Sequence, residues 1–152
     1  MNLNVDEQLF PTKGRCKFTQ YISKPDKFGI KFWLAWDTYS KYIINGFPYL
    51  VKVETRPSSV PIGEFVVLKL VVPFTQCWRH VTTDNFFTSV SLATKLLAKQ
   101  ITLVGVAVRS SRRELPKLAK IAKDKMECFS TIIYKSNDCT LTIYKTKSSK
   151  KL

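Results

Sequence analysis

Asp84 is a carboxylate in a strongly basic chain. It lies in the stretch HVTTDNFFTS, residues 80–89, between a β-branched run and two phenylalanines, whereas the whole chain has 25 lysines and arginines against 11 acidic residues. A carboxylate in this setting could hold a divalent cation, because Mg²⁺ prefers oxygen ligands. It could equally be a turn residue at the entry to a helix. Both interpretations stay open from these residues alone.

A second carboxylate, Asp6, lies in the opening segment NLNVDEQ. Leu3 and Val5 alternate with Asn4 and Asp6, which predicts a short strand whose second face carries Asp6. The alternative is that the Asp-Glu pair is simply exposed to solvent.

The other reactive residue types argue against other kinds of site. The single histidine, His80, lies within a predicted strand, where a packed side chain is the more common role, and a Cys/His or Ser/His/Asp catalytic set would have to use it. The cysteines are far apart and form no C-x-x-C pair, which argues against a zinc knuckle or a dithiol redox motif. They are Cys16, Cys77, Cys128 and Cys139, and we expect them to be reduced.

The charge favours polyanionic partners. A formal net charge of +14 attracts phosphate-rich molecules or anionic membrane surfaces, although a lysine-rich surface can also serve solubility alone. No apolar run approaches the roughly 18 to 20 residues that a membrane span needs, and the first residues do not resemble a signal peptide. We therefore expect no membrane span and no signal peptide. DNA is the expected partner, and we expect neither a membrane nor a small-molecule substrate as a partner.

Apolar patterning in the first half predicts a meander of strands. GIKFWLAWD at 29–37 places its large apolar residues on one face, and YIINGFPYLVKV after it predicts another strand, interrupted near Asn45-Gly46 and Pro48. Residues 8–28 are predicted to form a long connection. Together with the opening strand these segments give three antiparallel strands.

The second half alternates helices and strands. IGEFVVLKLVVPF predicts a helix that Pro73 ends, WRHVTTD a strand, TSVSLATKLLAK a helix capped by Thr88 or Ser89, and ITLVGVAV at 101–108 a strand buried on both faces. The order β-β-β-α-β-α-β is that of a ribonuclease-H-like mixed sheet. In that fold one carboxylate lies on the first strand and a second follows the fourth, and Asp6 and Asp84 hold these places. A basic segment and a β-hairpin around residues 136–138 follow.

Ordered motifs run through nearly the whole chain: VDEQLFPTKGRCKF at 5–18, YISKPDKFGIKFW at 21–33, NGFPYL at 45–50, PIGEFVV at 61–67, TDNFFTS at 83–89 and VGVAVRSSRRELP at 104–116. In this order they resemble the catalytic domain of piggyBac-type transposases and of the transposable-element-derived proteins related to them. The resemblance implies a catalytic core at residues 1–110, incomplete, and part of an insertion with a basic tail at residues 111–152.

The resemblance also implies a cut-and-paste transposase site in which three aspartates hold Mg²⁺ or Mn²⁺. Motif matches give the catalytic and metal-binding roles to Asp6 and Asp84. The third aspartate of such proteins follows a strand-rich insertion, and we expect it to be missing here, since Leu152 lies inside what resembles that insertion. The upstream region and the cysteine-rich C-terminal domain of the family are likewise expected to be absent.

Two basic groups are implied to bind DNA. One follows the last core strand and the other follows the first strand; for each residue the alternative is an ordinary surface charge. They are Arg109, Arg112 and Arg113, and Lys13, Arg15 and Lys17. The aromatic residues Trp33, Trp36, Phe86 and Phe87 are expected to be core residues, not platforms for base stacking.

We therefore expect a truncated, transposon-derived DNA-processing domain that is inactive alone, because two carboxylates cannot balance two divalent ions. One alternative is a non-enzymatic module that binds DNA or a protein. Another is a fragment of a longer gene whose remaining part supplies the third aspartate. Nuclear residence and, for the full-length ancestor, homo-oligomerisation are further expectations.

Overall fold

The computed structural model describes residues 2–14, 16–21, 28–50, 56–105, 117–119 and 125–146. The chain divides into two compact units, Met1–Val108 and Arg109–Leu152. Each unit is a body of its own, and the candidate carboxylates Asp6 and Asp84 both belong to the first.

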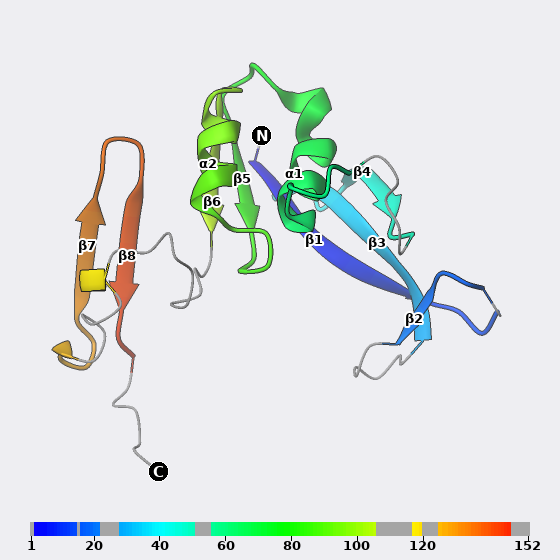
Figure 1. The fold of residues 1–152 in the computed structure, drawn as a ribbon, viewed down its shortest axis with the longest axis horizontal. Helices are drawn as coiled ribbons and strands as arrows, with labels where there is room; N and C mark the ends of the chain where they lie inside the picture. Colours follow the sequence, from blue (N-terminus) through cyan, green and yellow to red (C-terminus); the bar gives the residue numbers. More distant parts are fainter. Residues whose placement is uncertain are drawn as a thin grey trace, which may run out of the picture. The chain divides into compact units, whose positions relative to one another are not determined.

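The first unit is built on one mixed sheet (Figure 1). Its order is β2-β3-β1-β5-β6, and β4 pairs with β3 as well. β1 runs antiparallel to β3 and parallel to β5, and β5 runs parallel to β6. The strands are β1 (Asn2–Pro11), β2 (Thr19–Tyr21), β3 (Phe28–Asp37), β4 (Ile43–Pro48), β5 (Arg79–Thr83) and β6 (Ile101–Gly105). The predicted mixed α/β class is confirmed.

Two helices, α1 (Ile62–Val71) and α2 (Val90–Leu97), supply the crossovers that parallel strands require. The 3₁₀ turn η1 (Val72–Phe74) follows α1, so the helix ends before Pro73 as predicted. Ser89 caps α2, since its Oγ accepts a hydrogen bond from the Leu92 backbone N–H at 3.1 Å. Of the two caps that the sequence allowed, the structure uses the serine.

The core lies between the helices and one face of the sheet, and Figure 1 shows α1 and α2 on the same side. Odd-numbered residues of the strands meet the apolar stripes of both helices there, as the two-residue period of a strand requires. The fully buried members are Leu3, Val5, Trp33, Ala35, Val66, Val67, Leu70, Val71, Val81, Phe87, Leu92, Leu96 and Ile101. Because both helices belong to this core, the opposite face, which carries Asp6, holds neither of them.

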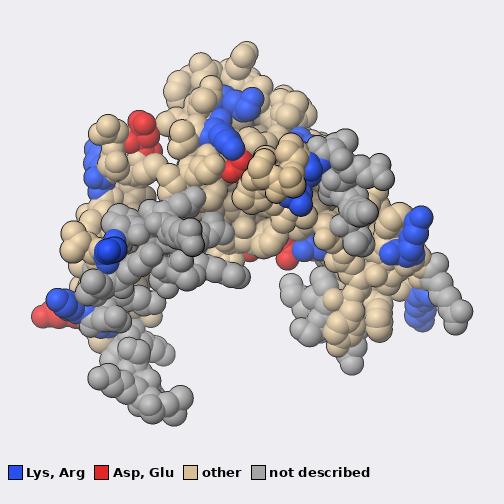
Figure 2. Space-filling model, in the orientation of Figure 1, with Lys and Arg blue, Asp and Glu red and all other residues tan. Residues whose placement is uncertain are grey.

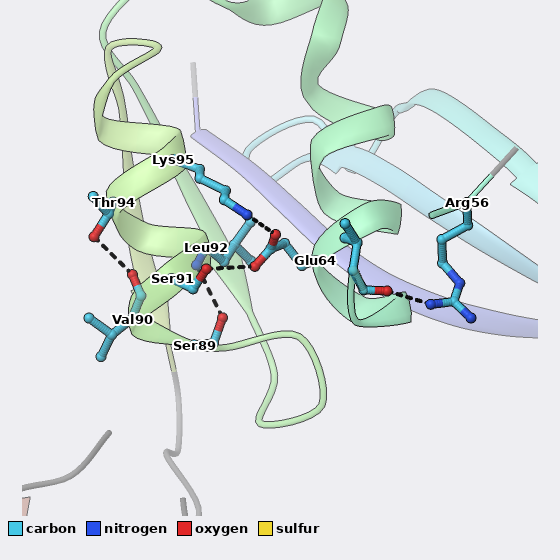
Figure 3. Close-up of polar contacts among 9 residues, drawn as sticks. Arg56, Glu64, Ser89, Val90, Ser91, Leu92, Thr94 and Lys95 are labelled. Atoms are coloured by element: carbon cyan, nitrogen blue, oxygen red, sulfur yellow. Dashed lines mark hydrogen bonds and ion pairs between the residues drawn. The ribbon is translucent and has the colours of Figure 1, made fainter. Parts of the chain in front are cut away.

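A buried carboxylate joins the two helices (Figure 3). Glu64 of α1 is 3% exposed, and it accepts hydrogen bonds from the Ser91 hydroxyl at 2.9 Å and from the Lys95 ammonium, both of α2. Burying a carboxylate costs much free energy unless it has such hydrogen-bond partners. Glu64 is therefore a structural acid between helices.

Two predictions about strands were wrong. Residues 8–28 are not one long connection, because β1 continues to Pro11 along β3 and residues 19–21 add a further strand to β3. The strand at 101–108 was predicted to be buried on both faces, but β6 is the edge of the sheet and Val104 is 53% exposed. Its apolar run reflects one packed face; residues 106–108 lie outside the described part of the chain.

The second unit contains the predicted hairpin, formed by β7 (Thr131–Lys135) and β8 (Thr140–Tyr144). The turn between them is closed by the Ser136 N–H, which donates to the Cys139 carbonyl at 2.8 Å. Most of the predicted basic helix before this hairpin lies outside the described residues, as does the basic tail. None of the helices described is long and apolar enough to cross a membrane.

Candidate metal centre

The parallel ladder between β1 and β5 brings Asp6 and Asp84 to neighbouring positions. It pairs Asn4 with Thr82 and ends at Val5 with Thr83, one residue before each aspartate. If the strand spacing of roughly 4.8 Å continued by one residue, their Cα atoms would lie side by side. Residues 78 positions apart in the sequence therefore directly follow the last pair of one parallel ladder.

Asp6 points away from the helical core. Leu3 and Val5 are buried on the core face, so strand alternation puts Asn4 and the half-buried Asp6 on the other face. Its Oδ1 accepts a hydrogen bond from the Glu7 N–H at 2.8 Å. Among the residues described, its Oδ2 accepts no hydrogen bond and no cationic side chain forms an ion pair with it.

The neighbouring acid, Glu7, has a different environment. It lies on the core-facing side of β1, and its carboxylate is 3.6 Å from the Lys31 Nζ. The Lys31 ammonium also lies 4.2 Å from the centroid of the Trp33 ring. The Asp-Glu pair of the sequence thus divides between the two faces, and only Asp6 lies on the face that Asp84 adjoins.

Asp84 is a turn residue, and only one of its two carboxylate oxygens takes part in the turn. Its Oδ1 accepts hydrogen bonds from the N–H groups of Phe86 at 2.9 Å and Phe87 at 3.3 Å, which is the side-chain turn expected of an aspartate at this position. Within the described residues its Oδ2 accepts none. The two interpretations that the sequence left open are therefore compatible, because one oxygen orients the side chain and the other remains available.

The hydroxyl groups of two threonines help to hold the turn after Asp84 in place. The Thr88 hydroxyl donates to the Asp84 carbonyl at 2.6 Å and lies 2.9 Å from the buried Thr83 hydroxyl. Gly105 on β6 faces Thr88 so closely that a Cβ there would lie 2.2 Å from the Thr88 Cγ2. This support was not predicted from the sequence, although Gly105 within the apolar run ITLVGVAV was a signal for it.

Aromatic rings fix the same turn against the sheet. Phe86 stacks on Trp33 with ring centroids 5.9 Å apart and an interplanar angle of 10°, and Phe87 meets the same indole edge-on at 5.5 Å. Trp33 and Phe87 are each 1% exposed, so the prediction that they are core residues is confirmed. The prediction was wrong for Phe86, which is 42% exposed because it lies on the outer side of the turn, and Trp36 is only half-buried.

The donor set consists of two carboxylates. Across the described ranges, no group of three or more His, Cys, Asp and Glu side chains could hold a metal ion. His80 pairs with Asn2 at the start of the β1–β5 ladder, and its Nδ1 contacts the Thr102 hydroxyl, so it lies apart from the two aspartates. All-oxygen donors suit Mg²⁺ or Mn²⁺ and do not suit zinc in a closed structural site.

Of the basic residues predicted to bind DNA, Lys13 and Lys17 are described and exposed. Both lie in the connection between β1 and β2. The other predicted residues, Arg15, Arg109, Arg112 and Arg113, lie outside the described residues.

A model of the family described as transposase IS4 matches residues 1–152. The chain belongs to this transposase family. The human piggyBac transposable element-derived protein 3 is 31% identical over 129 residues, which are 82% of this chain and 22% of that protein. The human chimeric ERCC6-PGBD3 protein has the same identity over the same share of this chain, and the match covers 12% of its length.

A solved structure resembles the chain as a whole. It is a piggyBac transposase in a synaptic complex with hairpin DNA, which matches with a TM-score of 0.87 and 40% identity over 96% of this chain and 30% of that one. The likeness to piggyBac-type transposases that the motifs implied is thus confirmed. The chain spans less than a third of each of these relatives. The family generally depends on divalent metal ions.

Proposed function

We propose that this chain is a transposon-derived DNA-processing domain whose Asp6 and Asp84 are the first two aspartates of a three-aspartate metal site. The observation that carries the proposal is the register of β1 and β5, which brings both aspartates to adjacent positions with one oxygen of each uncommitted. Two adjacent carboxylates can hold one divalent cation together with water and phosphate oxygens.

The ribonuclease-H-like fold belongs to the same proposal. Taken without the short β2, the sheet reads β4-β3-β1-β5-β6, with three antiparallel strands first and two parallel crossovers after them. This supports the strand order that the sequence predicted. It also supports the assignment of Asp6 to the first strand and of Asp84 to the end of the fourth.

In the proposed site, the two aspartates and the residues that orient them have separate roles. A bound Mg²⁺ or Mn²⁺ would activate a nucleophile and stabilise the leaving oxygen in phosphodiester cleavage. Asp6 would hold the cation from a rigid strand. Asp84 would hold it from a turn that is fixed by the Phe86 and Phe87 N–H groups and by Thr88. Both carboxylates are orientated before a metal binds, which lowers the cost of assembling the site.

Catalysis by these 152 residues alone is not part of the proposal. Two carboxylates carry two negative charges against the four positive charges of two divalent ions, and without substrate phosphate the repulsion between the ions goes largely uncompensated. We propose that the residues bind DNA and at most one cation weakly, and that cleavage needs a third carboxylate.

DNA is the proposed partner. The solved relative is described in complex with hairpin DNA, and the net charge of +14 suits a phosphate backbone. Nuclear residence is part of the proposal, and so is a homo-oligomer for the full-length ancestor. The second candidate function is a DNA-binding module that performs no chemistry. It is favoured because the described residues include no group of three side chains that could hold a metal ion.

The effect of Mn²⁺ on DNA affinity separates these functions. Without metal, Asp84 repels phosphate, so Asp84→Asn should bind a duplex more tightly than the native chain does. With Mn²⁺, a cation between the carboxylates and the phosphate should strengthen binding by the native chain and not by the variant. The exposed Asp138→Asn is a charge-matched control in the turn between β7 and β8.

The outcomes are distinct. If Mn²⁺ changes the DNA affinity of the native chain, Asp84→Asn and Asp138→Asn equally, only the DNA-binding module remains as a candidate function. Binding of either kind should weaken with salt, with a log-log slope near −4.5 for about five phosphate contacts. No duplex binding at low salt would contradict both candidates.

A further inference from the structure

Tyr21 and Phe28 form an exposed aromatic pair at the end of the β2–β3 ladder. Their Cα atoms are directly opposed, and their rings lie 5.3 Å apart with an interplanar angle of 59°. Tyr21 is 61% exposed and Phe28 58%. Aromatic surface in water is unfavourable, so a pair of rings left open in this way is a candidate contact surface.

The pair shares a sheet face with Asp6. The β1–β3 register opposes Asp6 to Leu34, Gln8 to Phe32 and Phe10 to Ile30. Residues directly opposed on neighbouring strands point to the same face, and every second residue of a strand does so too. Phe28 is in step with Ile30 and Phe32 on β3, and Tyr21 faces Phe28. The two rings therefore lie on the face of the candidate metal centre, opposite the helices.

Further rings lie between the pair and the carboxylate. Phe10 and Phe32 meet edge-on with ring centroids 5.1 Å apart, and Phe10 is 45% exposed. Phe28 is six residues from Leu34, the partner of Asp6, which is about 20 Å at the rise of a strand. A stacked DNA strand covers that length with about six nucleotides. One strand could thus reach from the aromatic pair to Asp6.

Positive charge adjoins the pair. The Thr12 N–H donates to the Phe28 carbonyl at 3.3 Å, so the connection that carries Lys13 and Lys17 begins beside Phe28. Lys17 lies over the Phe18 ring, 5.4 Å from its centroid. The described residues from 8 to 36 include no Asp or Glu. Figure 2 agrees, because blue side chains and no red ones are visible at the end of this unit where β2 lies.

We propose that Tyr21 and Phe28 are a stacking platform for unpaired bases of a DNA strand, with Lys13 and Lys17 contacting its phosphates. Every base has a π face, and stacking on an aromatic ring is available only when the base is not enclosed in a duplex. The proposal rests on DNA as the partner of this domain and adds that the strand is locally unpaired. Trp33 and Phe87 cannot serve in this way because they are buried.

Anisotropy of labelled oligonucleotides tests the platform. The probes are a single-stranded thymidine 12-mer and a duplex of the same length, both at low salt. The variant Tyr21→Leu/Phe28→Leu keeps apolar side chains and the net charge but removes both rings. The control Tyr39→Leu/Tyr42→Leu removes two rings that are 96% and 73% exposed in the turn between β3 and β4.

If the platform exists, the variant Tyr21→Leu/Phe28→Leu should raise the Kd for the single strand by about fivefold or more. It should raise the Kd for the duplex by less than about twofold. The control should change neither, and Tyr21→Phe should keep native affinity because the ring remains. If the leucine pair does not fold, Tyr21→Leu alone, with Phe28 in place, should raise the single-strand Kd by about twofold or more.

An unchanged single-strand Kd in the leucine variants would overturn the platform, and so would equal losses for single strand and duplex. The rings would then only pack across the strands. That result would leave the proposed function standing, provided that the native chain binds the duplex. Absence of binding to both probes would remove the DNA function and the platform together.

Discussion

Gly105 on β6 and Thr88 in the turn after Asp84 are so close that no side chain fits between them. A Cβ on Gly105 would lie 2.2 Å from the Cγ2 and 2.7 Å from the Oγ1 of Thr88. The same Thr88 hydroxyl donates to the Asp84 carbonyl. The edge strand of the sheet thus contributes, through Thr88, to the position of a candidate metal ligand.

The replacement Gly105→Ala should lower the free energy of unfolding by about 1–3 kcal/mol, because Thr88 or the strand must shift. Urea unfolding measures the change. In a Thr88→Ala background the same replacement should cost much less, since the clashing methyl and hydroxyl are gone. Equal costs in both backgrounds would mean that Gly105 and Thr88 are not coupled.

Lys95→Met should destabilise the fold by about 2 kcal/mol, because it leaves the buried Glu64 carboxylate with Ser91 as its one remaining side-chain donor among the described residues. Lys99→Met is the matched control, since Lys99 is exposed, and it should change stability by less than about 0.5 kcal/mol. Equal effects of the two replacements would mean that the ion pair between α1 and α2 contributes nothing.

The turn after β3 should respond to acid. The backbone N–H of Ser40 and then its hydroxyl hydrogen-bond the Asp37 carboxylate and hold its pKa below the ordinary value. A lowered folded-state pKa adds stability that is present above the unfolded pKa and lost as the pH falls through the folded one. An NMR titration should find the pKa of Asp37 raised towards its ordinary value in Ser40→Ala. Identical titration in both proteins would exclude this role for the hydroxyl.

Periodicity and turn chemistry predicted most of the elements of the first unit. The apolar faces of β3 and α1, the stop at Pro73 and the cap at Ser89 are local signals, and each appears in the structure. β2 was not predictable in this way. It is three residues long, and its pairing with β3 is a contact that no local pattern encodes.

The candidate site, like the fold, was predictable from local patterns only in part. The alternation of Leu3 and Val5 with Asp6 predicted the face of Asp6, and the motif match singled out Asp84. The two aspartates become neighbours through the register of the parallel β1–β5 ladder, and α1 leads the chain to β5. The apolar pattern of one strand does not specify its register with another strand. The sequence also did not single out Tyr21 and Phe28 as exposed rings. Their exposure follows from their place at the end of the β2–β3 ladder, which no local pattern encodes.

Calorimetric titration with Mn²⁺ tests the shared carboxylate site most directly. The native chain should bind one ion weakly, and Asp6→Asn and Asp84→Asn should each lower the affinity by about tenfold or more, or about 1.4 kcal/mol. Because both carboxylates hold the same ion, the double variant should lose less than the sum of the single losses, and Asp138→Asn should bind as the native chain does. Heats of binding that are the same for the native chain and both single variants would contradict the account.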